Sequence, residues 1–351
     1  MYNRSRIQQY DFINLTSSDP SDPPFQSLTF LDNRIVQSCH GLMLLHSNSG
    51  RYERSDNYCV YNPTTRQCLI LPPFPVNEVF NAICGINLAY DPSKSPHYKV
   101  ICVRGCENLE EGDFQIEIYS SKIGFWRKSR SSGIFTAHYE TNFGIGTFWN
   151  GALHWISPCD GSLYFDVDEE KVHDLPMPAI HADFRRRFRY FGESRDHLHL
   201  IEIYGPCTAL FNVYEMERDY SGWMIKYRVD LLSIAAAFPE MVRSYRDPLM
   251  EYLCYYGFSI LSIVREEEDE DSYLVVHIPN KAIRYNFKDK SFGRFMNLLR
   301  LVSKLKSRAH LNINGVMLFN TLKVLHMFDH VSVDQKSVQF IIVGYCYLLA
   351  T

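Results

Sequence analysis

Long apolar runs are missing from this sequence of 351 residues. Residues 1–14 have no apolar core, so we expect no secretory signal peptide. The most apolar end, Val338–Thr351, is 14 residues long and too short to cross a bilayer as a helix. We therefore expect no membrane partner and a cytoplasmic or nuclear location.

A framework of paired cysteines is also missing. Ten cysteines are scattered along the chain, and Cys102 and Cys106 have a CxxxC spacing without the second pair that would complete a zinc site. Reduced core cysteines are typical of proteins that are not exported. The cysteine pattern therefore predicts no metal site.

The chain has no surplus of positive charge, since its formal net charge is −4 at pH 7. This balance argues against nucleic-acid binding. The sequence contains no Walker loop, no HExxH and no GxSxG motif. Gly144–Gly151 has several glycines without the spacing of a dinucleotide-binding loop, and hairpin turns explain it better. We therefore expect no cofactor and a protein that is not an enzyme.

Aromatic residues, by contrast, make up 14% of the chain, which favours strands. Five segments share one pattern, in which an alternating apolar strand ends in Tyr or Phe and is followed by a short polar turn and another apolar residue. This pattern predicts β-hairpins. The turns are expected at Asn62–Thr65, Ser120–Gly124, Asp166–Lys171, Glu215–Gly222 and Asn286–Lys290.

The hairpins recur along the chain at a regular spacing. Their aromatic residues are 58, 46, 49 and 71 residues apart. One hairpin per unit at such a period is typical of kelch-like propeller blades. We predict a mainly β fold, a kelch-like β-propeller or incomplete propeller of four-stranded units, with an irregular β-sandwich as the alternative. The predicted structural anchors of the blades are Tyr61, Tyr119, Trp126, Trp155, Phe165, Tyr214, Trp223 and Tyr285.

Two stretches depart from the strand pattern. Asp230–Leu253 fills the longest gap, and its alanine-rich part predicts a short helix that Pro239 interrupts or restarts. From Phe295 to Lys306 the apolar residues fall on one face of a helix. This second pattern predicts an atypical helical segment near the C-terminus and leaves open how the propeller closes.

Seven motifs, in order from about Phe25 to Phe292, resemble the F-box-associated interaction domain of plant F-box proteins. The motifs are QSCHGLMLL, VYNPTTRQCLILPP, LAYDPSKSPHYKVICV, QIEIYSSKIGFWRKS, FWNGALHWIS, LYFDVDEEKVHDLPMP and YEMERDYSGWMIKYRVDL. The resemblance implies a kelch-like domain that holds the protein to be ubiquitinated. In that family an N-terminal F-box holds the adaptor subunit of a cullin-type ubiquitin ligase. The expected partner is therefore a target protein whose identity is unknown.

The resemblance also suggests a division into domains. Residues 1–24 are rich in Ser, Asp and Pro where the family has its helical F-box. We therefore expect a loop-like segment over 1–24 that does not bind the ligase adaptor. The F-box-associated domain is expected over 25–295, and a divergent C-terminal segment over 296–351. A propeller-type hydrolase and a non-functional truncated product are the alternative interpretations.

The segment FRRRFRYF is the candidate binding site, because arginine and aromatic residues are enriched at protein interfaces. It predicts a protein contact through Arg185, Arg186, Arg187 and Arg189. A solvated loop is the alternative, and nucleic-acid binding is disfavoured by the acidic net charge.

Histidines and acidic residues form further candidate sites. His197 and His199 alternate along a strand and share one face, where we favour a packing or surface role over metal binding. His154 lies beside a tryptophan and is expected to donate a structural hydrogen bond rather than to catalyse. The acidic run Glu266–Asp271 is expected to form a solvated hairpin loop, with attraction of a basic partner as the alternative.

Overall fold

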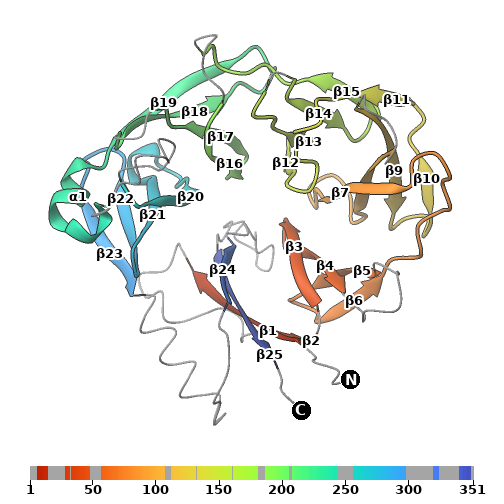
Figure 1. Cartoon of the computed structure of the whole chain (residues 1–351), viewed down its shortest axis with the longest axis horizontal. Helices are drawn as coiled ribbons and strands as arrows, with labels where there is room; N and C mark the ends of the chain where they lie inside the picture. The colour runs from red at the N-terminus through yellow and green to blue at the C-terminus, as the bar shows by residue number, and fades with distance from the viewer. Residues whose placement is uncertain are drawn as a thin grey trace, which may run out of the picture. The chain divides into compact units, whose positions relative to one another are not determined.

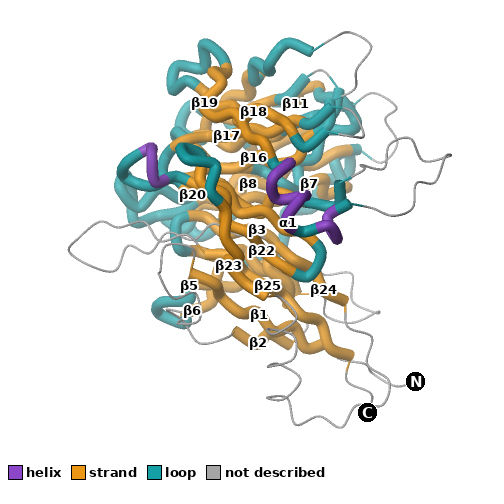
Figure 2. Tube along the Cα trace, turned by 90° about the vertical axis from the view of Figure 1, so that its left-hand side faces the viewer, coloured by secondary structure: helices purple, strands orange, loops and turns teal. Residues whose placement is uncertain are grey.

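The computed structural model describes most of the chain, and in those ranges the protein is mainly β, as predicted (Figure 2). The described residues are 6–14, 28–31, 33–47, 57–106, 112–131, 133–159, 161–180, 186–204, 208–242, 256–297, 319–323 and 340–348. The chain divides into two compact units. The first comprises Met1–Ser17, Ser21–Pro176 and Val316–Thr351, and the second Ser18–Pro20 and Met177–Gly315.

The described part of the first unit contains four antiparallel sheets, labelled in Figure 1. One sheet has the order β2-β1-β25-β24, and the others are β3-β4-β5-β6, β10-β9-β8-β7 with β11 on β9, and β12-β13-β14-β15. The strands are β1 (Arg6–Asn14), β2 (Leu28–Leu31), β3 (Asn33–Cys39), β4 (Leu42–Ser47), β5 (Asn57–Asn62), β6 (Gln67–Ile70), β7 (Ala82–Ala89), β8 (Lys99–Gly105), β9 (Asp113–Ser120), β10 (Trp126–Lys128), β11 (Ile134–Thr136), β12 (Thr147–Trp149), β13 (Ala152–Trp155), β14 (Leu163–Asp166), β15 (Lys171–Asp174), β24 (Phe319–Lys323) and β25 (Phe340–Leu348).

The second unit contains two four-stranded sheets in its described ranges, β16-β17-β18-β19 and β20-β21-β22-β23. Sequence neighbours pair in both sheets, and such four-stranded antiparallel sheets are the repeating unit of a β-propeller. The predicted propeller fold is thereby confirmed. The elements are β16 (Phe188–Ser194), β17 (His197–Glu202), β18 (Leu210–Met216), β19 (Trp223–Asp230), α1 (Leu232–Ala237), η1 (Pro239–Met241), β20 (Ser259–Val264), η2 (Asp269–Asp271), β21 (Tyr273–Ile278), β22 (Lys281–Asn286) and β23 (Phe292–Asn297).

The first sheet joins the two ends of the chain. Arg6 of β1 pairs with Leu348 of β25, and Asn14 pairs with Phe340. The prediction of a loop over residues 1–24 is therefore wrong for β1. The polar composition of this segment does not predict a strand. Its backbone hydrogen bonds are instead made with β25, a strand from the far end of the chain. The sequence pattern did not predict this sheet, in which strands from both ends of the chain pair in the order β2-β1-β25-β24.

Helix is scarce in the part of the chain that the structure describes. The predicted helix in the insertion is α1, and Pro239 begins the separate turn η1, as expected. The predicted helix from Phe295 is wrong at its start, because residues up to Asn297 belong to β23 and pair with β22. Residues 298–306 lie outside the described ranges. None of the described helices has the length and apolarity needed to cross a membrane.

The predicted outer hairpin turns are confirmed, and three of them share one geometry. Asn62, Asp166 and Asn286 each accept hydrogen bonds from the backbone N–H groups two and three residues later, at 2.7–3.3 Å. The residue four positions later, as in Glu170, has a positive φ of 57–58°. A short polar side chain at the start of each turn therefore replaces missing backbone bonds, which is a structural role and not a chemical one.

The inner hairpins of three sheets turn on two residues with positive φ. These are His40-Gly41, Asn150-Gly151 and Arg195-Asp196, whose φ values lie between 42° and 86°. Two such residues match the right-handed twist of the flanking strands. Asn-Gly suits this turn, whereas Arg195-Asp196 has no glycine to relieve the strain.

Apolar side chains between the sheets form the cores of the two units. Six of the eight predicted anchors are buried, namely Tyr61, Tyr119, Trp126, Trp155, Phe165 and Tyr285. Tyr214 and Trp223 are half-buried, so Trp223 is not the core residue that its strand pattern predicted. It begins β19, the outer strand of its sheet, which has a neighbouring strand on one side only. Trp149, which the sequence pattern did not single out, is fully buried.

Candidate functional site

The loop between β6 and β7 exposes two apolar side chains. Val76 is 94% exposed and Val79 is 59% exposed. Pro75 and Phe80 flank these residues along the chain, and the Phe80 side chain is buried whereas Pro75 is exposed. The loop therefore has one apolar side in the core and another in solvent.

Arg104 on β8 holds this loop by hydrogen bonds to two of its carbonyl groups. Its Nη2 donates a hydrogen bond to the carbonyl oxygen of Pro75 at 2.9 Å, and its Nη1 donates to that of Phe80 at 3.2 Å. Its Nε donates to Oε2 of Glu117 on β9 at 2.8 Å. Both charged side chains are at most 5% exposed. Because a guanidinium has several donors in a rigid plane, one buried side chain fixes the loop on either side of residues 76–79.

A second contact ties the middle of the loop to the sheet. The amide of Asn77 donates to Oε1 of Gln115 at 2.9 Å and accepts from the backbone N–H of Phe80 at 3.0 Å. Gln115 on β9 pairs directly with Ile134 on β11, so their side chains share one face of the sheet. Ile134 is 60% exposed.

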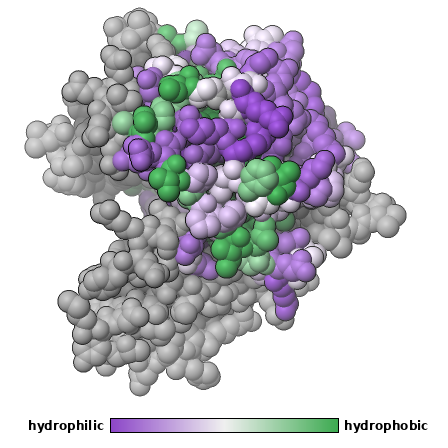
Figure 3. Space-filling view, turned by 90° about the vertical axis from the view of Figure 1, so that its right-hand side faces the viewer, coloured by the Kyte–Doolittle hydropathy of each residue, from purple (hydrophilic) through white to green (hydrophobic). Residues whose placement is uncertain are grey.

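We call Val76, Val79 and Ile134 the apolar loop surface. Exposed apolar groups on a backbone that is already held in place favour binding, because little conformational entropy remains to be lost. Figure 3 views the side of the molecule on which β10 and β11 lie in Figure 1, and it shows apolar groups separated by hydrophilic residues. Protein interfaces likewise combine apolar contacts with polar groups.

The predicted arginine site is not a single surface. Arg186 is buried, and its Nη1 donates to both carboxylate oxygens of Glu202 at 3.0 and 3.2 Å. Its Nη2 donates to the carbonyl oxygen of Pro178 at 2.7 Å. Arg186 is therefore a structural residue, and its assignment to a binding surface is wrong. Arg187 and Arg189 are exposed, and Arg185 lies outside the described residues.

His197 and His199 both face Glu215 on the neighbouring strand. The distances to its carboxylate are 2.8 Å from Nδ1 of His197 and 3.5 Å from Nε2 of His199. Arg265 approaches the same carboxylate to 3.6 Å. Burial raises the pKa of Glu215, but the two histidines outweigh this effect and lower its pKa below the ordinary value. The charge of the carboxylate is thus balanced by side chains of the same unit.

The other polar candidates have structural roles. His154 is buried, its Nδ1 lies 3.1 Å from the carbonyl oxygen of Thr147, and burial lowers its pKa to about 4. A neutral imidazole donates this hydrogen bond, which confirms the predicted role. The acidic run forms the predicted hairpin loop between β20 and β21. Its ion pairs, four in the described residues, are Arg195–Glu267, Lys226–Asp269, Arg265–Asp269 and Lys288–Glu270.

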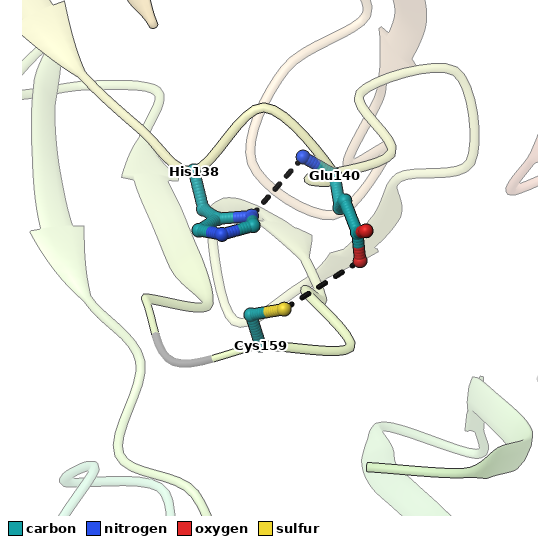
Figure 4. A group of neighbouring side chains, drawn as sticks. All are labelled: His138, Glu140 and Cys159. Atoms are coloured by element: carbon teal, nitrogen blue, oxygen red, sulfur yellow. Dashed lines mark hydrogen bonds between the residues drawn. The ribbon is translucent and has the colours of Figure 1, made fainter. Parts of the chain in front are cut away.

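One group of side chains in the described ranges has the composition of a metal site. Figure 4 shows His138, Glu140 and Cys159, which come from two loops of the first unit. One ligand atom from each lies within 4.8 Å of the other two. The sequence pattern does not reveal this group, because Cys159 is far from the other two residues along the chain.

Comparison with known proteins finds F-box proteins both among family models and among relatives. The model of the F-box associated beta propeller domain matches residues 5–195. The Arabidopsis thaliana F-box protein At5g07610 is 35% identical over 316 residues, which are 84% of this chain and 72% of that protein. The F-box/kelch-repeat protein At1g15680 of the same plant is 25% identical over 217 residues, which are 57% of this chain and 50% of that protein.

Among solved structures, the α-L-arabinofuranosidase Arb93A of Fusarium graminearum aligns with a TM-score of 0.42 and 11% identity. The alignment covers 89% of this chain and 92% of that one. A likeness this distant has no bearing on function.

Proposed function

The chain belongs to the family of F-box associated β-propeller domains, and from this premise we propose that it recognises a protein destined for ubiquitination. The target binds through the apolar loop surface. The observation that carries the proposal is the exposure of Val76 and Val79 on a segment whose flanking carbonyls, those of Pro75 and Phe80, are both held by buried Arg104. A pre-ordered apolar loop binds a partner at low entropic cost.

The side chains of this protein support binding of a partner rather than hydrolysis of a substrate. A propeller hydrolase requires carboxylates that face a substrate. In the described residues, the buried carboxyl groups all have partners within the protein. Arginines hold Glu117, Glu170 and Glu202, histidines and Arg265 hold Glu215, and Glu193 accepts from the N–H of Asp196. The proposal therefore places the protein among non-enzymatic modules. The free cysteines in the described ranges fit the cytoplasmic or nuclear location that forms part of the proposal.

We also propose that residues 1–24 do not bind the ligase adaptor. Arg6–Asn14 is paired along its whole length with β25, so it is not available as a helical surface. A pull-down of the purified adaptor tests this point with the present chain and with the chain fused to the F-box of a relative. We expect capture by the fusion only, and strong capture by the chain alone would contradict the proposal.

The recognition proposal is tested by changing the apolar loop surface. The double variant Val76→Asp/Val79→Asp places two charges on it without touching Arg104. The matched control is Leu210→Asp, an exposed apolar residue of the second unit. Partners are captured from plant extract with the wild type and both variants, and each candidate is then incubated with an F-box fusion and purified ligase components.

The expected result is a partner that the wild type and the Leu210→Asp variant capture and that the double variant loses. The fusion should ubiquitinate this partner, and a fusion with the double variant should not. A partner that is ubiquitinated equally with both fusions would show that the recognition surface lies elsewhere.

A further inference from the structure

Two loops of the first unit bring three metal-binding side chains together. His138 and Glu140 belong to a turn that follows β11, in which the backbone N–H of Thr141 donates to the carbonyl oxygen of His138 at 2.9 Å. The turn is held to the sheet where the N–H of Ala137 donates to the carbonyl oxygen of Gly112 at 2.9 Å. Its far end is fixed by the buried side chain of Phe143.

Cys159 lies in the loop after β13. Its backbone N–H lies 3.3 Å from the hydroxyl oxygen of Ser157, and the N–H of Ser157 donates to the hydroxyl of Ser162 at 3.0 Å. Both loops are thus anchored to strands by local hydrogen bonds. The side chains of His138, Glu140 and Cys159 are half-buried, so water and ions can reach them.

Hydrogen bonds link the three residues, and one of these bonds, between the Cys159 thiol and the Glu140 carboxylate, joins two of the ligand groups directly. The thiol of Cys159 donates to Oε2 of Glu140 at 3.5 Å, and Nδ1 of His138 accepts from the N–H of Glu140 at 3.2 Å. A metal ion would replace the thiol–carboxylate contact, because the thiol loses its proton when its sulfur binds a metal. Each of these donor atoms is a Zn²⁺ ligand in known proteins, and catalytic zinc sites use three such ligands with one open position.

We propose that His138, Glu140 and Cys159 bind a Zn²⁺ ion, which leaves a fourth position for water or for a side chain of a bound protein. On binding, the Cys159 thiol loses its proton to solvent and the thiolate sulfur bonds to the metal. The imidazole and the carboxylate provide the other two bonds. The mixture of sulfur, nitrogen and oxygen ligands favours Zn²⁺ over Mg²⁺ or Ca²⁺, which prefer oxygen alone.

The ion would connect two loops that no described strand pairing joins directly. The loop with His138 continues from β11, which carries Ile134 of the apolar loop surface. Tyr139 between the two ligands is 77% exposed, and its ring stacks on that of His138 at 4.4 Å. Zinc would therefore order an exposed aromatic beside a surface that we assign to recognition. The metal proposal itself does not depend on that assignment.

The cluster of His197, His199 and Glu215 is a weaker candidate for a metal. Arg265 lies 3.6 Å from the Glu215 carboxylate and already supplies a positive charge there. A divalent cation at that carboxylate would be repelled by the guanidinium.

Metal titration of the purified full chain tests the proposal. The chain is first stripped with a chelator, and Zn²⁺ is then added in competition with a chromophoric chelator. Co²⁺ is added separately, because a Co²⁺–thiolate bond has a charge-transfer absorption band. The variants are Cys159→Ser and His138→Gln, and the matched control is Cys84→Ser, an exposed cysteine elsewhere in the same unit. Circular dichroism checks that each variant is folded.

We expect one Zn²⁺ per chain in the wild type and in Cys84→Ser, with a Co²⁺–thiolate band in both. The Cys159→Ser variant should lose the band, and both site variants should bind Zn²⁺ at least about tenfold more weakly. Zn²⁺ should raise the thermal midpoint of the wild type more than that of either site variant. The proposal is overturned if the wild type binds no stoichiometric Zn²⁺, or if Cys84→Ser loses binding while Cys159→Ser keeps it.

Discussion

Each compact unit contains a buried arginine that contacts a buried glutamate and the carbonyl of a proline in a connecting loop. In the first unit, Arg104 contacts Glu117 and Pro75, and it also donates to Phe80. In the second unit, Arg186 contacts Glu202 and Pro178. In both units a buried guanidinium thus ties a connecting loop to a carboxylate of the neighbouring sheet.

The difference between the two arginines lies in how much of the loop each one holds. Arg104 binds the carbonyls of Pro75 and Phe80, so it holds the chain on either side of the exposed residues Val76 and Val79. Arg186 donates two hydrogen bonds to the carboxylate of Glu202 and only one to its loop, at the carbonyl of Pro178. The same buried charge pair therefore stabilises the fold in both units and shapes an exposed loop in the first.

The largest expected effect comes from removing the carboxylate of either pair. We expect Glu117→Ala and Glu202→Ala each to lower the free energy of unfolding by about 3–5 kcal/mol, because each leaves a buried guanidinium without its counter-charge. Urea unfolding measures the loss. Hydrogen exchange should locate it in β8 and β9 for the first variant and in β16 and β17 for the second.

The matched control for these variants is Glu169→Ala, which removes an exposed carboxylate paired with Lys171. Its effect should stay within about 0.5 kcal/mol. The double variant Arg104→Met/Glu117→Leu should recover most of the stability, because apolar side chains replace both charges. A loss below about 1 kcal/mol in either single variant would show that the buried pair is dispensable.

One buried group in each unit should give an opposite dependence of stability on pH. In the first unit, burial lowers the pKa of His154 to about 4, so the unfolded chain binds more protons between pH 4 and 6.5, and stability rises with pH in that window. In the second unit, burial raises the pKa of Glu193 to about 8. The folded chain then binds more protons between pH 4.5 and 8, and stability falls with rising pH.

Each group should contribute a slope of at most about 1.4 kcal/mol per pH unit in its window. Glu193→Gln keeps an acceptor for the N–H of Asp196, which lies 2.6 Å from the carboxylate, and should remove the contribution of this carboxyl to the slope. Urea unfolding at several pH values, followed by hydrogen exchange in each unit, provides the measurement. A slope that is unchanged in Glu193→Gln would contradict the assignment.

A smaller effect is expected at the inner hairpin turns. Gly151→Ala in the first unit should lower stability by about 1 kcal/mol, because φ is 78° at that position. Arg195→Asn/Asp196→Gly in the second unit should raise it by about 0.5–1 kcal/mol, because Asn-Gly suits two positive φ values. Thermal unfolding measures the stability change of each variant. If both variants changed stability in the same direction, turn strain would not be what distinguishes the two turns.

The smallest effect on stability should accompany the largest effect on binding. Val76→Asp changes a side chain that is 94% exposed, and its free energy of unfolding should stay within about 0.5 kcal/mol of the wild type. Binding of the target should nevertheless weaken at least tenfold if Val76 is a central contact. Isothermal titration with the identified partner gives the affinity, and an unchanged affinity would remove Val76 from the recognition surface.

Much of the fold could be predicted because its signals are local. The Asn62 turn and the Asn150-Gly151 turn depend on a few consecutive residues, whose side chains and permitted φ values select the turn. Pro239 likewise ends α1 through its own ring geometry. The alternating strands and their repeat then indicate a propeller, which requires no knowledge of distant contacts.

The candidate sites could be predicted far less well, because they depend on contacts between distant residues. A run of arginines does not reveal which of them meets a buried carboxylate, and Arg186 was therefore misassigned. The pairing of β1 with β25 likewise cannot be read from either end alone.

The sequence by itself determined the turns, the strand periodicity and the family of this protein, because each of these is encoded in residues close together along the chain. Only the tertiary structure decided that Arg104 holds the loop with Val76, and that Cys159 lies beside His138 and Glu140. The physical reason is that burial and ligand geometry depend on which side chains the folded backbone brings within a few ångströms of one another.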